Sequence, residues 1–143
     1  MKNIYCAGAI KGDTKFRNFY EEIIRIVNRE GFIALTELNI DLSVKKNLSD
    51  KEIYKRDIGW LTDSSKMIAE VSGASLGVGY EIAYALNVLR IPVLALFHNT
   101  VDKASAMITG CSSPLLQVMK YEDNNDLENK VVSFLNTGEN YKP

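Results

Sequence analysis

Apolar residues along the chain form two alternating kinds of pattern. Short apolar runs bounded by Gly, Asp or Ser are typical of buried strands. Stripes with a spacing of three and four residues are typical of amphipathic helices, and the one from Phe16 to Val27 ends before Gly31. Strands are predicted at 4–7, 32–35, 67–71, 91–97 and 116–119. Helices are predicted at 16–27, 49–61, 78–89, 103–109 and 126–135, with a loop at 39–47.

Two of these helices carry further signals. Ser49 and Glu52 have the spacing of a capping box, which places a helix start at residue 49. The helix at 78–89 has charged residues only near its ends, so we expect it to be largely buried.

Strands that alternate with helices predict an α/β fold. We expect a doubly wound, five-stranded parallel sheet in the order 2-1-3-4-5, with helices on both faces. Residues 1–135 form a single domain in this prediction, followed by a flexible tail at 136–143. Ligands of such sheets bind where the strand order reverses, which selects the loops at 8–13 and 72–79.

Composition narrows the possible partners and chemistry. Lys and Arg number 17 and Asp and Glu number 18, so no positive excess favours a nucleic acid polymer. The longest apolar run, 91–97, is far shorter than the ~20 residues that span a membrane. The chain starts on a strand pattern rather than a signal peptide, so the expected location is the cytoplasm.

The few histidine and cysteine residues limit the available chemistry further. His98 is the only histidine; it ends the fourth strand at the ligand edge and is interpreted as a loop histidine. Cys6 and Cys111 are interpreted as free thiols. Neither a histidine triad nor a metal site is expected, so carboxylates, hydroxyls and backbone groups must supply any chemistry.

Glu81 is the first candidate for such chemistry. It follows Ser75-Leu76-Gly77-Val78-Gly79-Tyr80 at the start of an apolar helix, at the predicted ligand edge. Glycines let a ligand approach the backbone, and a helix N-terminus attracts phosphate. The alternative is that Glu81 only complements the helix dipole.

Asp57 is the second candidate, because it shares a helical face with Ile53, Trp60 and Leu61. A carboxylate on an apolar face needs a partner or a function. It is either a structural ion pair with Lys55 or Arg56, or one of two carboxylates that act on a glycosidic bond.

Three further side chains complete the interpretation. Tyr5, near the end of the first strand, either reaches the cleft or enters the core, and Met107 and Met119 are interpreted as core residues.

Several motifs together resemble the 2′-deoxynucleoside 5′-phosphate N-hydrolases of the nucleoside 2-deoxyribosyltransferase superfamily. These motifs are Tyr5-Cys6-Ala7-Gly8-Ala9-Ile10-Lys11-Gly12, Leu35-Thr36-Glu37, Asp57-Ile58-Gly59-Trp60-Leu61, Ala69-Glu70-Val71-Ser72, Ser75-Leu76-Gly77-Val78-Gly79-Tyr80-Glu81 and Ser105-Ala106-Met107-Ile108 with Gly110. The resemblance implies hydrolysis of a nucleoside 5′-monophosphate to a free base and (deoxy)ribose 5-phosphate, without a cofactor.

The resemblance also implies roles for individual residues. Glu81 is the nucleophile, Asp57 orients it or protonates the base, and Tyr5 binds near the reacting centre. Ser75, Gly77 and Gly79 hold the 5′-phosphate, joined by Ser105 from the other subunit of a homodimer. Further substrate contacts are implied for Gly8, Ile10, Lys11, Gly12, Trp60 and Met107.

The chain departs from the family pattern at three positions. Ala9 and Lys11 stand where the family commonly has Ser and Arg, and Leu38 stands where members carry His. A hydroxyl and a planar guanidinium are thereby lost from the first loop.

Two other functions stay open. A nucleoside 2-deoxyribosyltransferase would pass the sugar to a second base instead of water. A non-catalytic nucleotide-binding module would share the architecture, although a phospho-receiver would need Asp where the third strand carries Glu70.

Overall fold

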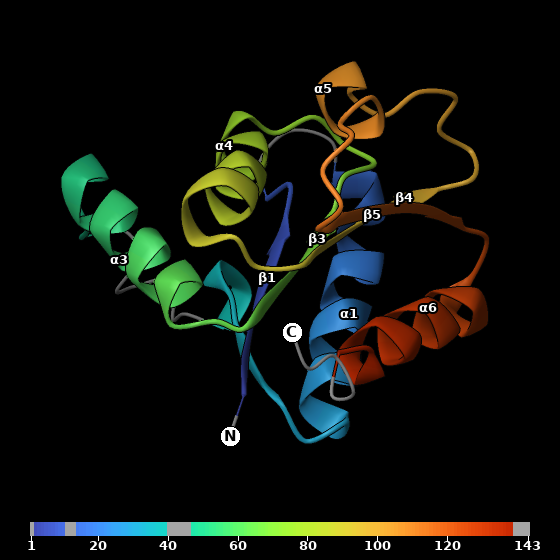
Figure 1. Ribbon diagram of the computed structural model, residues 1–143, viewed down its shortest axis with the longest axis horizontal. Coiled ribbons are helices and arrows are strands. Elements are labelled where there is room, and N and C mark those ends of the chain that lie inside the picture. Colours follow the sequence, from blue (N-terminus) through green and yellow to red (C-terminus); the bar gives the residue numbers. More distant parts are fainter. Residues whose placement is uncertain (1, 11–13, 40–46, 139–143) are drawn as a thin grey trace.

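The computed structural model describes residues 2–10, 14–39 and 47–138 and contains one parallel sheet of five strands. The strand order is β2-β1-β3-β4-β5, which confirms the predicted topology. Helices lie on both sides of the sheet, with α1 and α6 together on one side and α3 and α4 on the other (Figure 1).

The strands begin and end within two residues of their predicted bounds. They are β1 (Asn3–Gly8), β2 (Ile33–Leu35), β3 (Lys66–Glu70), β4 (Val93–His98) and β5 (Leu116–Tyr121). The α-helices are α1 (Arg17–Arg29), α3 (Asp50–Thr62), α4 (Leu76–Tyr84), α5 (Ala106–Thr109) and α6 (Asn124–Asn136). Short 3₁₀ turns η1 (Thr14–Phe16) and η2 (Glu37–Asn39) and a π-helical segment η3 (Ala85–Leu89) complete the described elements.

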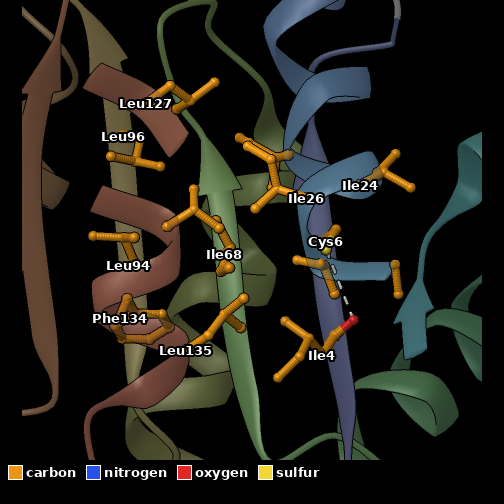
Figure 2. Close-up of a cluster of buried hydrophobic side chains, with 14 of the residues drawn as sticks. Ile4, Cys6, Ile24, Ile26, Ile68, Leu94, Leu96, Leu127, Phe134 and Leu135 are labelled. Atoms are coloured by element: carbon orange, nitrogen blue, oxygen red, sulfur yellow. Dashed lines mark hydrogen bonds between the residues drawn. The ribbon is translucent and has the colours of Figure 1, made fainter. Parts of the chain in front are cut away.

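The period of two along each strand divides the core into two layers. Ile4, Cys6, Ile68, Leu94 and Leu96 face α1 and α6 and form the first layer (Figure 2). The residues between them on the same strands face α3 and α4. This second layer contains Tyr5, Ala7, Met67, Ala69, Val93 and Ala95 from the strands, and Leu61, Val78, Ile82 and Ile108 from the helices.

The predicted capping box starts α3. The Ser49 hydroxyl accepts a hydrogen bond from the Glu52 amide at 3.2 Å, and the Glu52 carboxylate accepts one from the Ser49 amide at 3.2 Å. This helix carries Asp57 in its third turn, so the cap sets where Asp57 enters the fold.

The segment at 78–89 corrects two expectations. It is not one helix, because α4 ends at Tyr84 and continues as the π-helical segment. It is also not largely buried, because Tyr80 and Val88 are 53% and 60% exposed. The apolar sequence supplies two faces here, and only one of them packs on the sheet.

Two single-residue expectations were also wrong. Met107 is 83% exposed and Met119 is 37% exposed, so neither is a core residue. His98 ends β4, as expected, and its ring lies 5.1 Å from the Phe19 ring and 5.4 Å from the Tyr121 ring. These aromatic contacts close one end of the first core layer.

Other expectations fall partly outside the described residues. Most of the predicted 39–47 loop and Lys11 and Gly12 lie there, as do residues 139–143 of the expected tail. Asn136, placed in that tail, is the last residue of α6. Across the described ranges, no helix combines the length and apolar character needed to cross a membrane.

Gly8 is required by packing, since a Cβ there would lie 2.7 Å from the Tyr20 ring. The ring cannot retreat easily, because it is buried and its hydroxyl donates to the Cys6 carbonyl oxygen at 2.8 Å. We expect Gly8→Ala to lower the free energy of unfolding by ~1–3 kcal/mol in urea titration. The control is Gly59→Ala in α3, where a Cβ meets nothing within 4 Å and the variant should gain ~0.5–1 kcal/mol. Equal effects would contradict the packing argument.

Candidate active site

A cavity of about 730 Å³ lies at the carboxyl edge of the sheet. Its walls come from the end of β1, the turn after β2, one side of α3 and the N-terminal half of α4. This is the point at which the strand order reverses, as predicted. The lining includes Tyr5, Gly8, Ile10, Tyr20, Glu37, Asp57, Ser75, Gly77, Tyr80 and Glu81.

Glu81 enters the cavity from α4 and receives a hydrogen bond from Tyr5. The Tyr5 hydroxyl donates to Glu81 Oε2, and the Tyr5 side chain is only 2% exposed. Burial raises the pKa of Glu81 to about 7; the Tyr5 hydrogen bond lowers it, and the carboxylates of Asp57 and Glu37 raise it. The same burial, with the adjacent Glu81 charge, raises the pKa of Tyr5, so its proton stays on the phenol.

Asp57 is held by its neighbour in α3 and by a residue from another element. The Arg56 Nε donates to Asp57 Oδ1 at 3.0 Å. Burial, and next a hydrogen bond and the charge of Glu37, raise the pKa of Asp57, Arg56 lowers it, and the resulting pKa is about 7. The ion pair with Arg56 that was the structural alternative therefore exists, and Asp57 lines the cavity as well.

The N-terminus of α4 forms a further part of the cavity wall. Ser75 caps the helix, and its hydroxyl accepts from the Val78 amide at 3.3 Å. The Gly79 amide donates to the Ser75 carbonyl oxygen at 3.1 Å and is therefore used within the helix. The amides of Leu76 and Gly77 precede the first intrahelical hydrogen bond. Their N–H groups can therefore donate to a bound anion.

A buried carboxylate fixes the loop that leads into α4. Glu70, 3% exposed at the end of β3, accepts from the Ser72 amide at 2.7 Å, the Ser72 hydroxyl at 2.9 Å and the Tyr121 hydroxyl. Ser72 in turn accepts from the His98 amide at 2.8 Å. These bonds tie the start of the loop to the ends of β4 and β5, so α4 is anchored before its cap.

The cavity brings together most of the predicted site residues. Tyr5, Gly8, Ile10, Asp57, Ser75, Gly77 and Glu81 line it. Trp60, Gly79, Ser105 and Met107 do not; Trp60 packs under the Arg56 guanidinium at 4.8 Å, and Ser105 caps α5. Lys11 and Gly12 fall outside the described residues.

Sequence reasoning missed Glu37 and the aromatic residues Tyr20, Tyr54 and Tyr80 as part of the lining. Glu37 follows the end of β2, so the rule that selected the loops after β1 and β3 could have selected it too. Tyr54 and Tyr80 carried no such signal. Their hydroxyls lie 2.8 Å apart, but the two residues are 26 positions apart in the sequence and come from two different helices.

Comparison with known proteins places the chain in a family. A sequence model described as nucleoside 2-deoxyribosyltransferase matches residues 4–130. The chain belongs to this family. A Danio rerio member named 5-hydroxymethyl-dUMP N-hydrolase is 35% identical over 94% of this chain and 96% of its own length. A Methanosarcina mazei member, assigned by name to the 2′-deoxynucleoside 5′-phosphate N-hydrolases, is 35% identical over 94% and 84%. These matches confirm the resemblance drawn from the motifs.

A solved structure shares the fold of this family member. The CMP N-glycosidase of Clostridium botulinum superposes with a TM-score of 0.69 and 14% identity, covering 93% of this chain and 99% of that one. At this identity the likeness supports the fold alone.

The carboxyl groups of the site can supply both an anion and a proton donor. Two carboxyl groups with a pKa near 7 in one cavity can divide the roles of anion and proton donor. Among the residues that the structure describes, no group of three or more His, Cys, Asp or Glu side chains is arranged to hold a metal ion.

The raised pKa of Glu81 predicts a stability change with pH. An unfolded Glu has a pKa near 4.3, so the folded chain binds this proton more tightly and loses stability as pH rises from about 4.3 through the folded pKa of about 7. We expect Glu81→Gln to raise the midpoint of thermal unfolding at pH 8 by about 4 °C, or ~1 kcal/mol for a domain of this size. The gain should shrink at pH 5. Glu21→Gln, which removes an exposed partner of Arg17, is the control and should not raise the midpoint at pH 8.

Proposed function

We propose that this chain hydrolyses the N-glycosidic bond of 2′-deoxynucleoside or nucleoside 5′-monophosphates, releasing the base and a sugar 5-phosphate. The observation that carries the proposal is the meeting of Glu81, Tyr5 and Asp57 in one cavity with the N-terminus of α4. A sugar ring between these features has carboxylates at its reacting carbon and a phosphate site at its far end. The names of the family members support this substrate class.

Glu81 is the proposed nucleophile. Cleavage of an N-glycosidic bond develops positive charge on the sugar, which an adjacent carboxylate stabilises and then captures. The Tyr5 hydroxyl donates to one oxygen of Glu81 and fixes the orientation of the carboxylate. The other oxygen is then available to bond with the anomeric carbon.

Asp57 is the proposed general acid. A departing base carries the electron pair of the broken bond and leaves more easily when it receives a proton. With its pKa raised to about 7, Asp57 holds a proton under conditions in which an ordinary Asp is ionised.

The 5′-phosphate would bind at the start of α4. The Ser75 hydroxyl and the amides of Leu76 and Gly77 lie there, and the helix dipole favours an anion. Because the phosphate is remote from the reacting bond, its binding energy positions the sugar over Glu81.

A panel of nucleotides tests this function. We expect free base, detected by chromatography, from one or more nucleoside 5′-monophosphates, with kcat/KM at least 10²-fold higher than for the same nucleoside without phosphate. Glu81→Gln should lose at least 10³-fold in kcat while remaining folded, because it keeps the shape and loses the charge. Equal rates with and without phosphate, together with exchange of the sugar onto an added base, would instead establish a deoxyribosyltransferase. Binding without base release would establish a nucleotide-binding module.

We also propose that two copies of the chain form a dimer in which Ser105 completes the partner's phosphate site. Leu76 and Met107 are 97% and 83% exposed although both are large and apolar. They lie on the same side of the sheet, because Ile108 packs in one cluster with Val78 and Ile82. An exposed apolar surface of this kind beside a cavity favours a second protein surface over water.

Mixed dimers test the contribution of Ser105. Ser105→Ala and Glu81→Gln homodimers should both be impaired. After co-expression, about half of the dimers are mixed. Each mixed dimer has one site of two with both Glu81 and Ser105, so about one quarter of all sites should be active. No recovery, or a fully active monomer in light scattering, would contradict the shared site.

A further inference from the structure

A guanidinium and two carboxyl groups meet on the wall of the cavity, apart from the contact between Tyr5 and Glu81. Arg56 Nη2 lies 2.9 Å from Asp57 Oδ1 and 3.3 Å from Glu37 Oε1. The side chains of Arg56, Asp57 and Glu37 are 15%, 14% and 23% exposed. Asp57 and Glu37 line the cavity, whereas Arg56 does not. The group therefore joins α3 to the turn after β2.

The charges of this group do not balance when both carboxyls are ionised. Two negative charges then surround one positive charge in a site that is largely removed from water. One proton shared by Asp57 and Glu37 makes the group neutral. Arg56 is fixed independently of the carboxyls, because its guanidinium lies over the Trp60 ring at 4.8 Å.

Asp57 is the carboxyl that retains this proton. It is the less exposed of the two, and Glu37, whose carboxylate contacts the same Arg56 nitrogen, is the nearby acceptor. The charged groups around it are Glu37 and Arg56 in direct contact and Glu81 across the cavity, with Tyr5 beyond, donating to Glu81. The two Glu carboxylates favour a protonated Asp57, and Arg56 opposes them.

We propose that Glu37 is a positioning residue that keeps the proton on Asp57 until the base departs. The inference rests on the proposed N-glycosidase function and adds a residue to which no role has been assigned. Glu37 touches the acid rather than the reacting atoms. Its carboxylate holds the Asp57 O–H, and Arg56, which already contacts Asp57, stabilises the Asp57 carboxylate once the proton has gone.

The proposed sequence balances protons and electrons. The N-glycosidic bond breaks, its electron pair stays on the base, and Asp57 transfers its proton to the base while a Glu81 oxygen bonds to the anomeric carbon. Water then attacks that carbon and gives its proton to the Asp57 carboxylate, and Glu81 leaves as a carboxylate. The pair of Asp57 and Glu37 again holds one proton.

Titration of Asp57 tests the inference without any turnover. We expect the ¹³C signal of the Asp57 carboxyl, assigned with Asp57→Asn, to titrate near neutral pH in the wild type. In Glu37→Gln the midpoint should fall by at least one pH unit, because Arg56 is no longer opposed. Glu37→Asp should restore part of the shift. Asp63→Asn, at the exposed end of the same helix, is the matched control and should change nothing. An unchanged midpoint in a folded Glu37→Gln would overturn the inference.

Kinetics with two leaving groups separate proton donation from a structural role. At pH 8 we expect kcat of Glu37→Gln on a natural nucleotide to fall about tenfold for each pH unit of the Asp57 shift, with little change in KM. A 4-nitrophenyl 2-deoxyriboside 5-phosphate, whose leaving group needs no proton, should keep its rate. Equal losses on both substrates would mean that Glu37 only supports the fold. A wild type that cleaves no nucleotide would refute the proposed function and leave the titration result standing.

Discussion

The opposite directions in which the chain leaves β1 and β3 create the cavity on which every functional feature depends. After β1 the chain passes to α1 on one face of the sheet, and after β3 it passes to α4 on the other (Figure 1). Neighbouring strand ends therefore have no helix between them, and side chains can fill the space. Tyr5 from β1 meets Glu81 from α4 across this gap although 76 residues separate them.

The same geometry brings acidic groups into a place where ionisation is unfavourable. Glu81, Asp57 and Glu37 come from three different elements and face one cavity. Burial and mutual repulsion raise the pKa of the first two to about 7, while Arg56 supplies the only direct ion-pair partner among the described side chains around them. In the proposed function these carboxylates stabilise positive charge on the substrate, and their burial lowers the stability of the free protein.

The fold could be predicted largely because its signals are local. Apolar periods of two and of three to four residues located the strands and most helices, and Ser49 with Glu52 marked the start of α3. The errors about burial share one cause, because the sequence does not mark which side of an apolar element stays in solvent. Met107, Met119 and the outer face of α4 were therefore placed in the core and are exposed.

The sequence by itself determined the order of the elements, the parallel sheet and the loops at its ligand edge, and the motif resemblance singled out Tyr5, Asp57 and Glu81. Only the tertiary structure decided which groups share a proton and which carry the charge. That decision depends on burial and on neighbours through space, such as Glu37 beside Asp57 and Tyr5 beside Glu81. Electrostatic interactions act over distances of a few ångströms in the folded chain, so no spacing along the sequence encodes them directly.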